Sequence, residues 1–196
     1  MTRQQLDPDI WKRLYLTWVD ERCVPFGDPQ SNRGSAYGSG VLDAKHPVGL
    51  ELPLYLDDEG PQEACQRVEW VLSQDFQEGL DILLLGMGEE GHIASIFPSM
   101  PAQGGPPPSE NLRFITPSLV LVYSVLNSPK PPPQRITLAL SFLERAGETI
   151  LVAAGESKRR ALEELKAGNP NYPATHLKNL RVFTDLPELA EDEQES

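Results

Sequence analysis

A histidine and a carboxylate share a glycine-rich turn near the middle of the chain. Gly86, Gly88 and Gly91 precede His92, and Glu90 lies two residues before the histidine. A histidine titrates near neutral pH, so it can accept a proton from water and return it to a leaving group. Glycine lets the backbone approach a ligand closely and lets Glu90 and His92 project into one pocket. The turn therefore predicts a site for acid–base chemistry.

The glycine setting distinguishes His92 from the other histidines. A lone histidine is more often structural, and His46 and His176, which have no such setting, are interpreted in that way. The spacing Gly86-x-Gly88-x-x-Gly91 also matches the dinucleotide-binding pattern, which requires a long helix after the turn. Pro98 leaves room for only a short helix, so we expect no dinucleotide site.

Two further segments place charged side chains where apolar stretches end. Asp20-Glu21-Arg22 follows the run 14–19, and Gly155-Glu156-Ser157-Lys158 follows the run 149–154. Such charges usually mark the exit of a strand into solvent, and in α/β proteins they also mark the rim of an active site. A lysine in the first turn of a helix opposes the helix dipole, and either a bound anion or solvent would relieve that conflict at Lys158.

A third segment, 128–137, carries Lys130 and Arg135 on either side of three prolines. Pro131-Pro132-Pro133 is typical of an extended polyproline stretch. The stretch either forms a stiff arm that presents both cations to a ligand or connects two strands with its charges in solvent. Two or three convergent cations with backbone N–H groups can bind a phosphate.

The elements that must position these segments alternate along the chain. Helical spacing of apolar residues predicts helices at 61–78 and 156–167. Short apolar runs predict strands at 14–19, 80–85, within 114–125, and at 136–140, 149–153 and 180–183. This alternation is typical of an α/β fold, in which ligands bind beyond the carboxyl ends of the strands. The near-continuous apolar run 80–85 predicts a strand covered by helices on both faces.

Composition excludes several classes of protein. A chain of 196 residues with 39% hydrophobic residues can form one domain with a full core. The net charge of −12 argues against a large surface for nucleic acid or an anionic membrane, but it leaves room for a small anionic substrate. The longest apolar runs are too short to cross a bilayer, and residues 1–9 lack the apolar stretch of a secretory signal.

We expect one domain at 1–187 and a disordered acidic tail at 188–196. The prolines of 101–108 predict a surface loop. Cys23 and Cys65 are too few for a disulfide framework and lack the spacing of metal ligands. We therefore expect free thiols in a cytoplasmic protein.

Four segments together resemble the 6-phosphogluconolactonase family, in the same order and from about residue 11 to residue 185. They are Asp20-Glu21-Arg22-x-Val24-Pro25 with Ser31-Asn32; Leu85-Gly86-Met87-Gly88-x-x-Gly91-His92-x-Ala94-Ser95-x-Phe97-Pro98; Ser128-Pro129-Lys130-Pro131-Pro132 with Arg135-Ile136-Thr137; and Gly155-Glu156-x-Lys158. The resemblance implies a modified Rossmann-like open sheet with helices on both faces, in a single domain. It also implies hydrolysis of 6-phospho-D-glucono-1,5-lactone in the oxidative pentose phosphate pathway, with no metal and no organic cofactor.

The resemblance also implies roles for residues. His92 would be the general base that activates water, and Glu90 would orient the imidazole. The substrate, a small sugar phosphate, would be bound by Asp20, Arg22, Gly88, Gly91, Lys130, Arg135 and Lys158.

The chain departs from the family pattern in two ways. The family usually has Asp at the position of Glu90, and it carries a segment with a Ser-Gly-Gly phosphate loop before the Asp20-Glu21-Arg22 strand. Without that segment we expect weak binding of phosphate, and self-association through an open sheet edge beside 14–19.

Two alternatives stay open. A glucosamine-6-phosphate deaminase/isomerase has a similar Gly-His turn, but it continues with Phe-Asn-Glu-Pro where this chain has Ser95-Ile96-Phe97-Pro98. That family also tends to have Tyr at the position of Arg22, and Ile93 alone favours it. The other alternative is a sugar-phosphate-binding remnant without catalytic activity.

Overall fold

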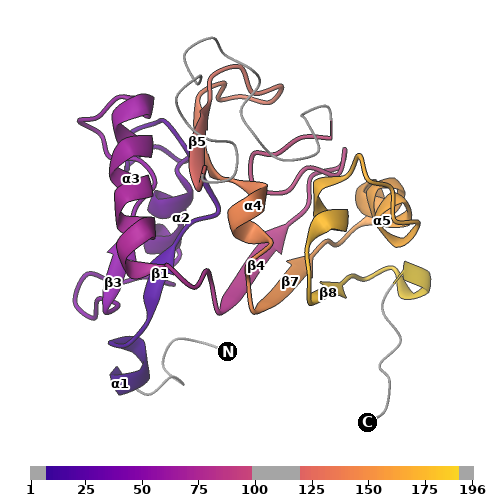
Figure 1. Ribbon diagram of the computed structural model, residues 1–196, viewed down its shortest axis with the longest axis horizontal. Coiled ribbons are helices and arrows are strands. Elements are labelled where there is room, and N and C mark those ends of the chain that lie inside the picture. The colour runs from indigo at the N-terminus through magenta and orange to yellow at the C-terminus, as the bar shows by residue number, and fades with distance from the viewer. Residues whose placement is uncertain (1–7, 99–119, 190–196) are drawn as a thin grey trace.

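The computed structural model describes residues 8–98 and 120–189 (Figure 1). The strands are β1 (Tyr15–Thr17), β2 (Asp20–Arg22), β3 (Leu50–Leu52), β4 (Ile82–Gly86), β5 (Val122–Val125), β6 (Arg135–Leu138), β7 (Glu148–Val152) and β8 (Leu180–Phe183). The helices are α1 (Pro8–Trp11), α2 (Asn32–Gly38), α3 (Pro61–Asp75), α4 (Leu140–Leu143) and α5 (Arg159–Lys166), with short 3₁₀ turns at Glu156–Lys158, Pro173–His176 and Pro187–Leu189. The expected α/β class is confirmed.

Some predicted features lie outside the described residues. These are the loop at 101–108, the first part of the strand expected within 114–125, and the tail from residue 190 onward. None of the described helices is long and apolar enough to cross a membrane.

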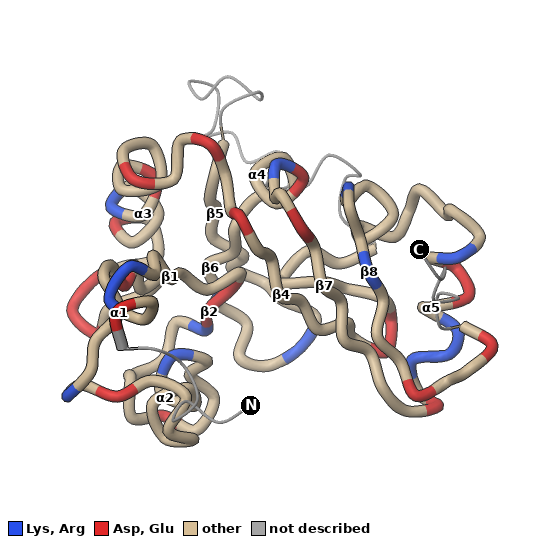
Figure 2. Tube along the Cα trace, turned by 90° about the horizontal axis from the view of Figure 1, so that it is seen from below, with Lys and Arg blue, Asp and Glu red and all other residues tan. Residues whose placement is uncertain are grey.

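The strands form three sheets. β4, β7 and β8 are parallel, with Gly86 opposite Val152, so the segments after β4 and β7 leave the sheet at the same edge. β2, β6 and β5 are antiparallel, with Arg22 opposite Arg135. β1 pairs in parallel with β3. Figures 1 and 2 both show β1, β4, β7 and β8 in one row, although β1 and β4 belong to different sheets.

The long helix α3 shows how local signals and packing act together. Pro61 occupies its first turn, where a missing N–H costs nothing, and the Glu63 carboxylate accepts a hydrogen bond from the Gly60 N–H at 2.9 Å. Its apolar residues recur at helical spacing, and Ala64, Val68 and Leu72 are fully buried. α3 packs beside β5 and β6 and so supports the antiparallel sheet.

The two faces of the β4–β7–β8 sheet differ. Leu83, Leu85 and Leu151 are buried in the core on one face. On the other face Ile82 and Leu84 are 60% and 65% exposed, together with Val152 and Phe183 at 55% and 51%. The expected cover on both sides of this strand is therefore missing among the described residues. We call the set Ile82, Leu84, Val152 and Phe183 the open face.

Candidate active site

The turn after β4 depends on two glycines. The Gly88 N–H donates to the His92 carbonyl at 2.8 Å, and the Gly91 N–H donates to the Gly88 carbonyl at 2.9 Å. A Cβ at Gly88 would lie 2.0 Å from Nδ1 of His92. Gly91 has φ +88°, and a Cβ there would lie 2.3 Å from the ring of Tyr172. Both N–H groups are engaged inside the turn, so these glycines supply space and shape.

The imidazole of His92 lies between the turn and an aromatic ring. Phe97 packs against it with ring centroids 4.5 Å apart, and the His92 side chain is 17% exposed. Nδ1 lies 3.3 Å from Oε2 of Glu90, yet it is buried and makes no hydrogen bond to the described residues. Burial lowers the pKa of His92; Glu90 raises it, Lys130 lowers it, and Asp20 raises it. The pKa stays below its ordinary value, so the ring is neutral at neutral pH, as a general base must be.

The carboxylate of Glu90 lies between the ammonium of Lys130 and the imidazole of His92. Lys130 Nζ donates to its Oε2 at 2.8 Å, the same oxygen that faces His92. Partial burial raises the pKa of Glu90, but the bonds from Lys130 and from its own backbone N–H outweigh this effect and lower the pKa. Glu90 is therefore ionised at neutral pH. The structure thus brings His92, Glu90 and Lys130 together, as expected.

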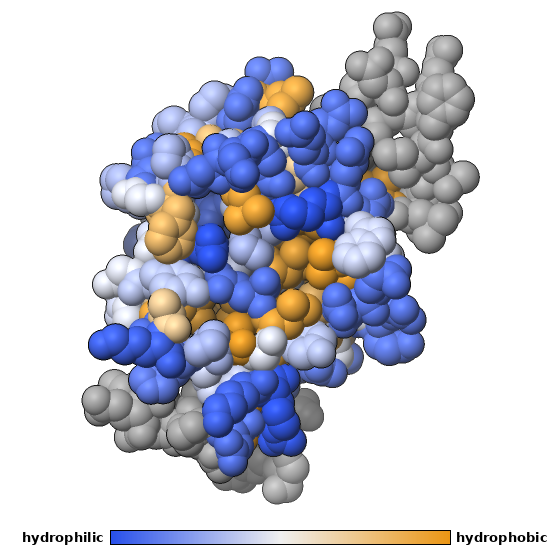
Figure 3. All heavy atoms as spheres, turned by 90° about the vertical axis from the view of Figure 1, so that its left-hand side faces the viewer, coloured by the Kyte–Doolittle hydropathy of each residue, from blue (hydrophilic) through white to orange (hydrophobic). Residues whose placement is uncertain are grey.

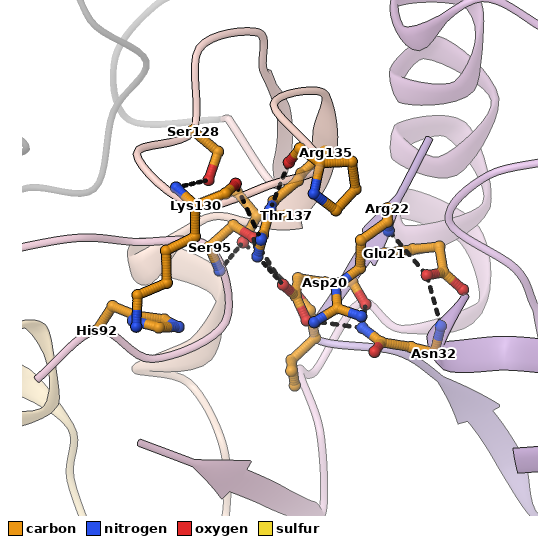
Figure 4. A network of polar contacts seen from close by, with 12 residues as sticks. Asp20, Glu21, Arg22, Asn32, His92, Ser95, Ser128, Lys130, Arg135 and Thr137 are labelled. Carbon is orange, nitrogen blue, oxygen red and sulfur yellow. Dashed lines mark hydrogen bonds and ion pairs between the residues drawn. The ribbon is translucent and has the colours of Figure 1, made fainter. Parts of the chain in front are cut away.

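A second polar group joins this turn to the antiparallel sheet (Figure 4). Asp20 is buried on β2 and accepts hydrogen bonds from Ser95 Oγ at 2.6 Å and from Asn32 Nδ2 at 3.1 Å. The Ser95 N–H donates to Thr137 Oγ1 at 3.3 Å. Ser95 therefore connects the segment after β4 to β2 and β6. Ser95 and Asn32 were not expected to be site residues, although both lie inside the motifs that resemble the family.

Arg135 is buried beneath the proline loop, defined as 128–133. Its side chain is 4% exposed, and Nη1 lies 3.8 Å from Asp20 Oδ2. Nε donates to the Pro132 carbonyl at 3.1 Å, and Nη2 donates to the carbonyls of Lys130 and Pro131 at 3.2 Å and 3.0 Å. Burial, and then the neighbouring Arg22, lower the pKa of Arg135, while Asp20 raises it. These contacts hold the loop; contact of Arg135 with substrate stays a prediction.

The other two expected cations lie at different places. Arg22 donates through Nη1 to the Gln30 carbonyl at 2.6 Å, and its Nε is buried without a hydrogen bond to any described atom. Lys158 ends the 3₁₀ turn after β7, at the sheet edge where the His92 turn also emerges. Within 8–98 and 120–189 its ammonium has no ion-pair partner. Both side chains therefore retain hydrogen-bonding capacity.

Glu21 has a structural role that its place in the sequence does not reveal. It is 3% exposed, and its carboxylate accepts hydrogen bonds from the backbone N–H groups of Arg22, Asn32 and Arg33 at 2.7, 2.8 and 2.7 Å. Ser31 Oγ donates to the same carboxylate at 3.2 Å. Glu21 thus fixes the start of α2 beside β2, which places Asn32 against Asp20.

Other reactive side chains in the described chain do not form a second centre. No group of three or more His, Cys, Asp or Glu residues there could hold a metal ion. Cys23 and Cys65 are free, and burial is the main cause that raises the pKa of each thiol to about 12. Both thiols are therefore protonated at neutral pH and poor nucleophiles.

The chain is similar to known proteins along most of its length. Residues 2–184 match the family model described as glucosamine-6-phosphate isomerases/6-phosphogluconolactonase. A 6-phosphogluconolactonase of Rattus norvegicus is 35% identical over 172 residues, which cover 83% of this chain and 62% of the rat protein. One of Mycobacterium leprae is 32% identical over 177 residues, with 86% and 66% covered. The chain therefore spans about two thirds of the length of these relatives or less.

The fold agrees as well. The crystal structure of a 6-phosphogluconolactonase from Thermotoga maritima superposes with a TM-score of 0.72 at 26% identity. The match covers 92% of this chain and 75% of that one.

Proposed function

Because the chain belongs to the glucosamine-6-phosphate isomerase/6-phosphogluconolactonase family, we propose that it hydrolyses 6-phospho-D-glucono-1,5-lactone to 6-phosphogluconate. The observation that carries the proposal is the neutral, partly buried His92 beside the ionised Glu90. The 6-phosphogluconolactonases of rat and Mycobacterium leprae support the choice of substrate. The reaction belongs to the oxidative branch of the pentose phosphate pathway.

In the proposed reaction His92 removes a proton from water through Nε2, the nitrogen that does not face Glu90. The resulting hydroxide adds to the lactone carbonyl. The ring C–O bond then breaks, and the ring oxygen takes the proton back from the imidazolium as it becomes a hydroxyl group. Glu90, two residues away, stabilises the imidazolium while it exists.

Arg22, Lys130 and Lys158 are the proposed contacts for the phosphate and for the developing oxyanion. Each has hydrogen-bonding capacity in the structure: Arg22 Nε has no hydrogen-bond partner among the described residues, the Lys130 side chain is 43% exposed, and Lys158 is partly exposed with no ion-pair partner in the described chain. Asp20 already accepts a hydrogen bond from Ser95, and Arg135 donates to the carbonyl of Pro131 and lies beside Asp20. We therefore propose that these two residues position the site rather than bind the phosphate directly.

The deaminase alternative finds less support. Phe97 occupies the position where that family has Glu in Phe-Asn-Glu-Pro, and it is buried against the His92 ring. No carboxylate can act from this position. The alternative of binding without catalysis is separated from the proposal by measuring binding and turnover side by side.

A lactonase assay with His92→Ala tests the proposal. The loss of a general base should lower kcat by roughly two to four orders of magnitude. His176→Ala is the matched control, because this histidine is partly exposed and its Nε2 contacts the Pro170 carbonyl at 2.9 Å, outside the candidate site; its rate should match the wild type. A thermal-shift titration with 6-phosphogluconate runs beside the assay. Binding without turnover would favour a binding protein, and an unchanged rate in His92→Ala would contradict the assignment of the base.

A further inference from the structure

One carboxylate oxygen of Glu90 lies close to two nitrogen atoms, one from Lys130 and one from His92. Oε2 of Glu90 accepts a hydrogen bond from Lys130 Nζ at 2.8 Å and lies 3.3 Å from His92 Nδ1, to which it is not hydrogen-bonded. Nδ1 is buried and has no other hydrogen-bond partner in the described chain. A general-base histidine acts best when a carboxylate holds the proton on the nitrogen opposite the reacting one. In the structure the Glu90 carboxylate is hydrogen-bonded to Lys130, and no carboxylate holds a proton on Nδ1 of His92.

The backbone of Lys130 is fixed while its ammonium is accessible. Arg135 Nη2 binds the Lys130 carbonyl at 3.2 Å, and the Lys130 N–H donates to Ser128 Oγ at 3.3 Å. The Lys130 side chain itself is 43% exposed, so a dissolved anion can reach the ammonium. A lysine side chain reorients easily because its charge lies at the end of a flexible stem.

We propose that Lys130 couples the arrival of an anion to the orientation of His92. In the free protein the ammonium holds Glu90. When a phosphate group forms an ion pair with the Lys130 ammonium, the Lys130–Glu90 bond breaks. Glu90 Oε2 then turns to accept a hydrogen bond from His92 Nδ1–H, and Nε2 is left free to accept a proton. Lys130 is then a positioning residue. That the natural anion is the phosphate of the lactone rests on the proposed function; the coupling itself requires only a phosphate-class anion.

The charges that face His92 set the sign of the expected response. They are Glu90 from its own turn, Lys130 from the proline loop and Asp20 from β2. Transfer of the ammonium from Glu90 to an anion weakens its repulsion of the imidazolium and strengthens the attraction of the carboxylate. Anion binding should therefore raise the pKa of His92 and convert the neutral ring to the Nδ1–H tautomer.

Nitrogen-15 NMR of the imidazole tests this coupling. The variant His46→Gln/His176→Gln leaves His92 as the sole histidine of the chain, so its ring nitrogens can be assigned directly. In phosphate-free buffer above the pKa we expect the Nδ1–H form to be the minority. Saturating inorganic phosphate should make it the majority. Lys130→Gln in the same background should show the Nδ1–H majority without phosphate, and Lys130→Arg should behave as the wild type.

Three results would overturn the inference: an Nδ1–H majority in the free wild type, a tautomer that does not respond to phosphate, or a Lys130→Gln variant with the wild-type tautomer. The pKa of His92 is expected to rise in Lys130→Gln even without a positioning role, because the loss of a positive charge alone raises it. The tautomer of His92 therefore separates this electrostatic effect from a positioning role. No step uses the lactone, so failure of the lactonase assay and failure of the coupling are distinguishable.

Discussion

The side chain of Gly88 is a hydrogen atom, and the ring of His92 fills the space that any larger side chain would need. A methyl group there would meet the imidazole at 2.0 Å and the Glu90 carboxylate at 2.8 Å. We expect Gly88→Ala to displace both groups and to lower kcat by about two orders of magnitude, because small misplacements of reacting groups are costly.

Gly86→Ala is the control for this prediction. Gly86 ends β4 two residues earlier, and a Cβ at this position meets no atom within 4 Å. Its lactonase rate should stay close to that of the wild type. Equal losses in the two variants would show that the turn, and not the space beneath His92, limits activity.

The fall of activity at low pH depends on the protonation of His92. Burial, the largest influence, lowers the pKa of His92 below 6.5, so activity should persist below that pH and fall only at lower pH. Glu90 raises this pKa and Lys130 lowers it. In profiles of kcat/KM the inflection should therefore move to lower pH in Glu90→Gln and to higher pH in Lys130→Gln. Shifts in the same direction for both variants would contradict these signs.

The free energy of unfolding should also depend on the protonation of His92. A histidine whose pKa is lowered by folding contributes stability above its unfolded pKa, and this contribution is lost as the pH falls through the folded value.

At the scale of elements, the run 14–19 shows what a local pattern can and cannot predict. It predicts one strand that ends before Asp20, whereas the structure has β1 within the run and a second strand, β2, at Asp20–Arg22 directly after it; the two pair with β3 and β6 in different sheets. Alternation and apolar content identify extended backbone, but the partner of a strand depends on residues far along the chain. β3, α2 and α4 were not predicted, because each is short and has a weak pattern of its own.

The candidate site also has features that local sequence predicts and features that it does not. The Gly-x-Gly-x-x-Gly-His turn and the Lys–Pro motif predict which side chains carry chemistry, and the structure brings His92, Glu90 and Lys130 together. The link from Ser95 to Asp20 joins residues 75 positions apart, and no local pattern contains it. The same holds for the burial of Arg135, a residue expected only to bind substrate.

The proline loop depends on Arg135, and this dependence is measurable. Arg135→Met would leave Asp20 without its nearby guanidinium and would free three loop carbonyls. We expect a loss of about 3 kcal/mol in the free energy of unfolding by urea, as for other broken buried pairs. Arg181→Met is the control: Arg181 pairs with Glu148 at the surface with 56% of its side chain exposed, so it should cost less than about 1 kcal/mol. Equal costs would show that the loop is held by other contacts.

At the scale of the whole molecule, two features bear on association: the open face and the unpaired strand edges that each sheet of the described chain has. β1 and β4 each pair on one side only within the described chain. Figure 3, seen from the side of α3 and α1, also shows hydrophobic residues gathered in the middle of the surface between hydrophilic regions. Exposed apolar patches and open edges promote association.

We therefore expect concentration-dependent self-association, measured by sedimentation velocity. Leu84→Thr should weaken it, because Leu84 is 65% exposed on β4 and threonine keeps the preference for a strand. Leu126→Thr is the control: Leu126 is 53% exposed but follows β5, in a different sheet from the open face. A wild-type protein that stays monomeric at high concentration would contradict the expectation.

The open face also affects how stability depends on temperature. Ile82, Leu84, Val152 and Phe183 touch water in the native state, and they touch water again when the chain unfolds. They therefore add little to the rise in heat capacity on unfolding, which comes from apolar surface newly exposed to solvent. A smaller heat-capacity change flattens the curve of free energy against temperature. Compared with a sheet buried on both faces, this one gains less from the hydrophobic effect at its optimum and loses less of it in the cold.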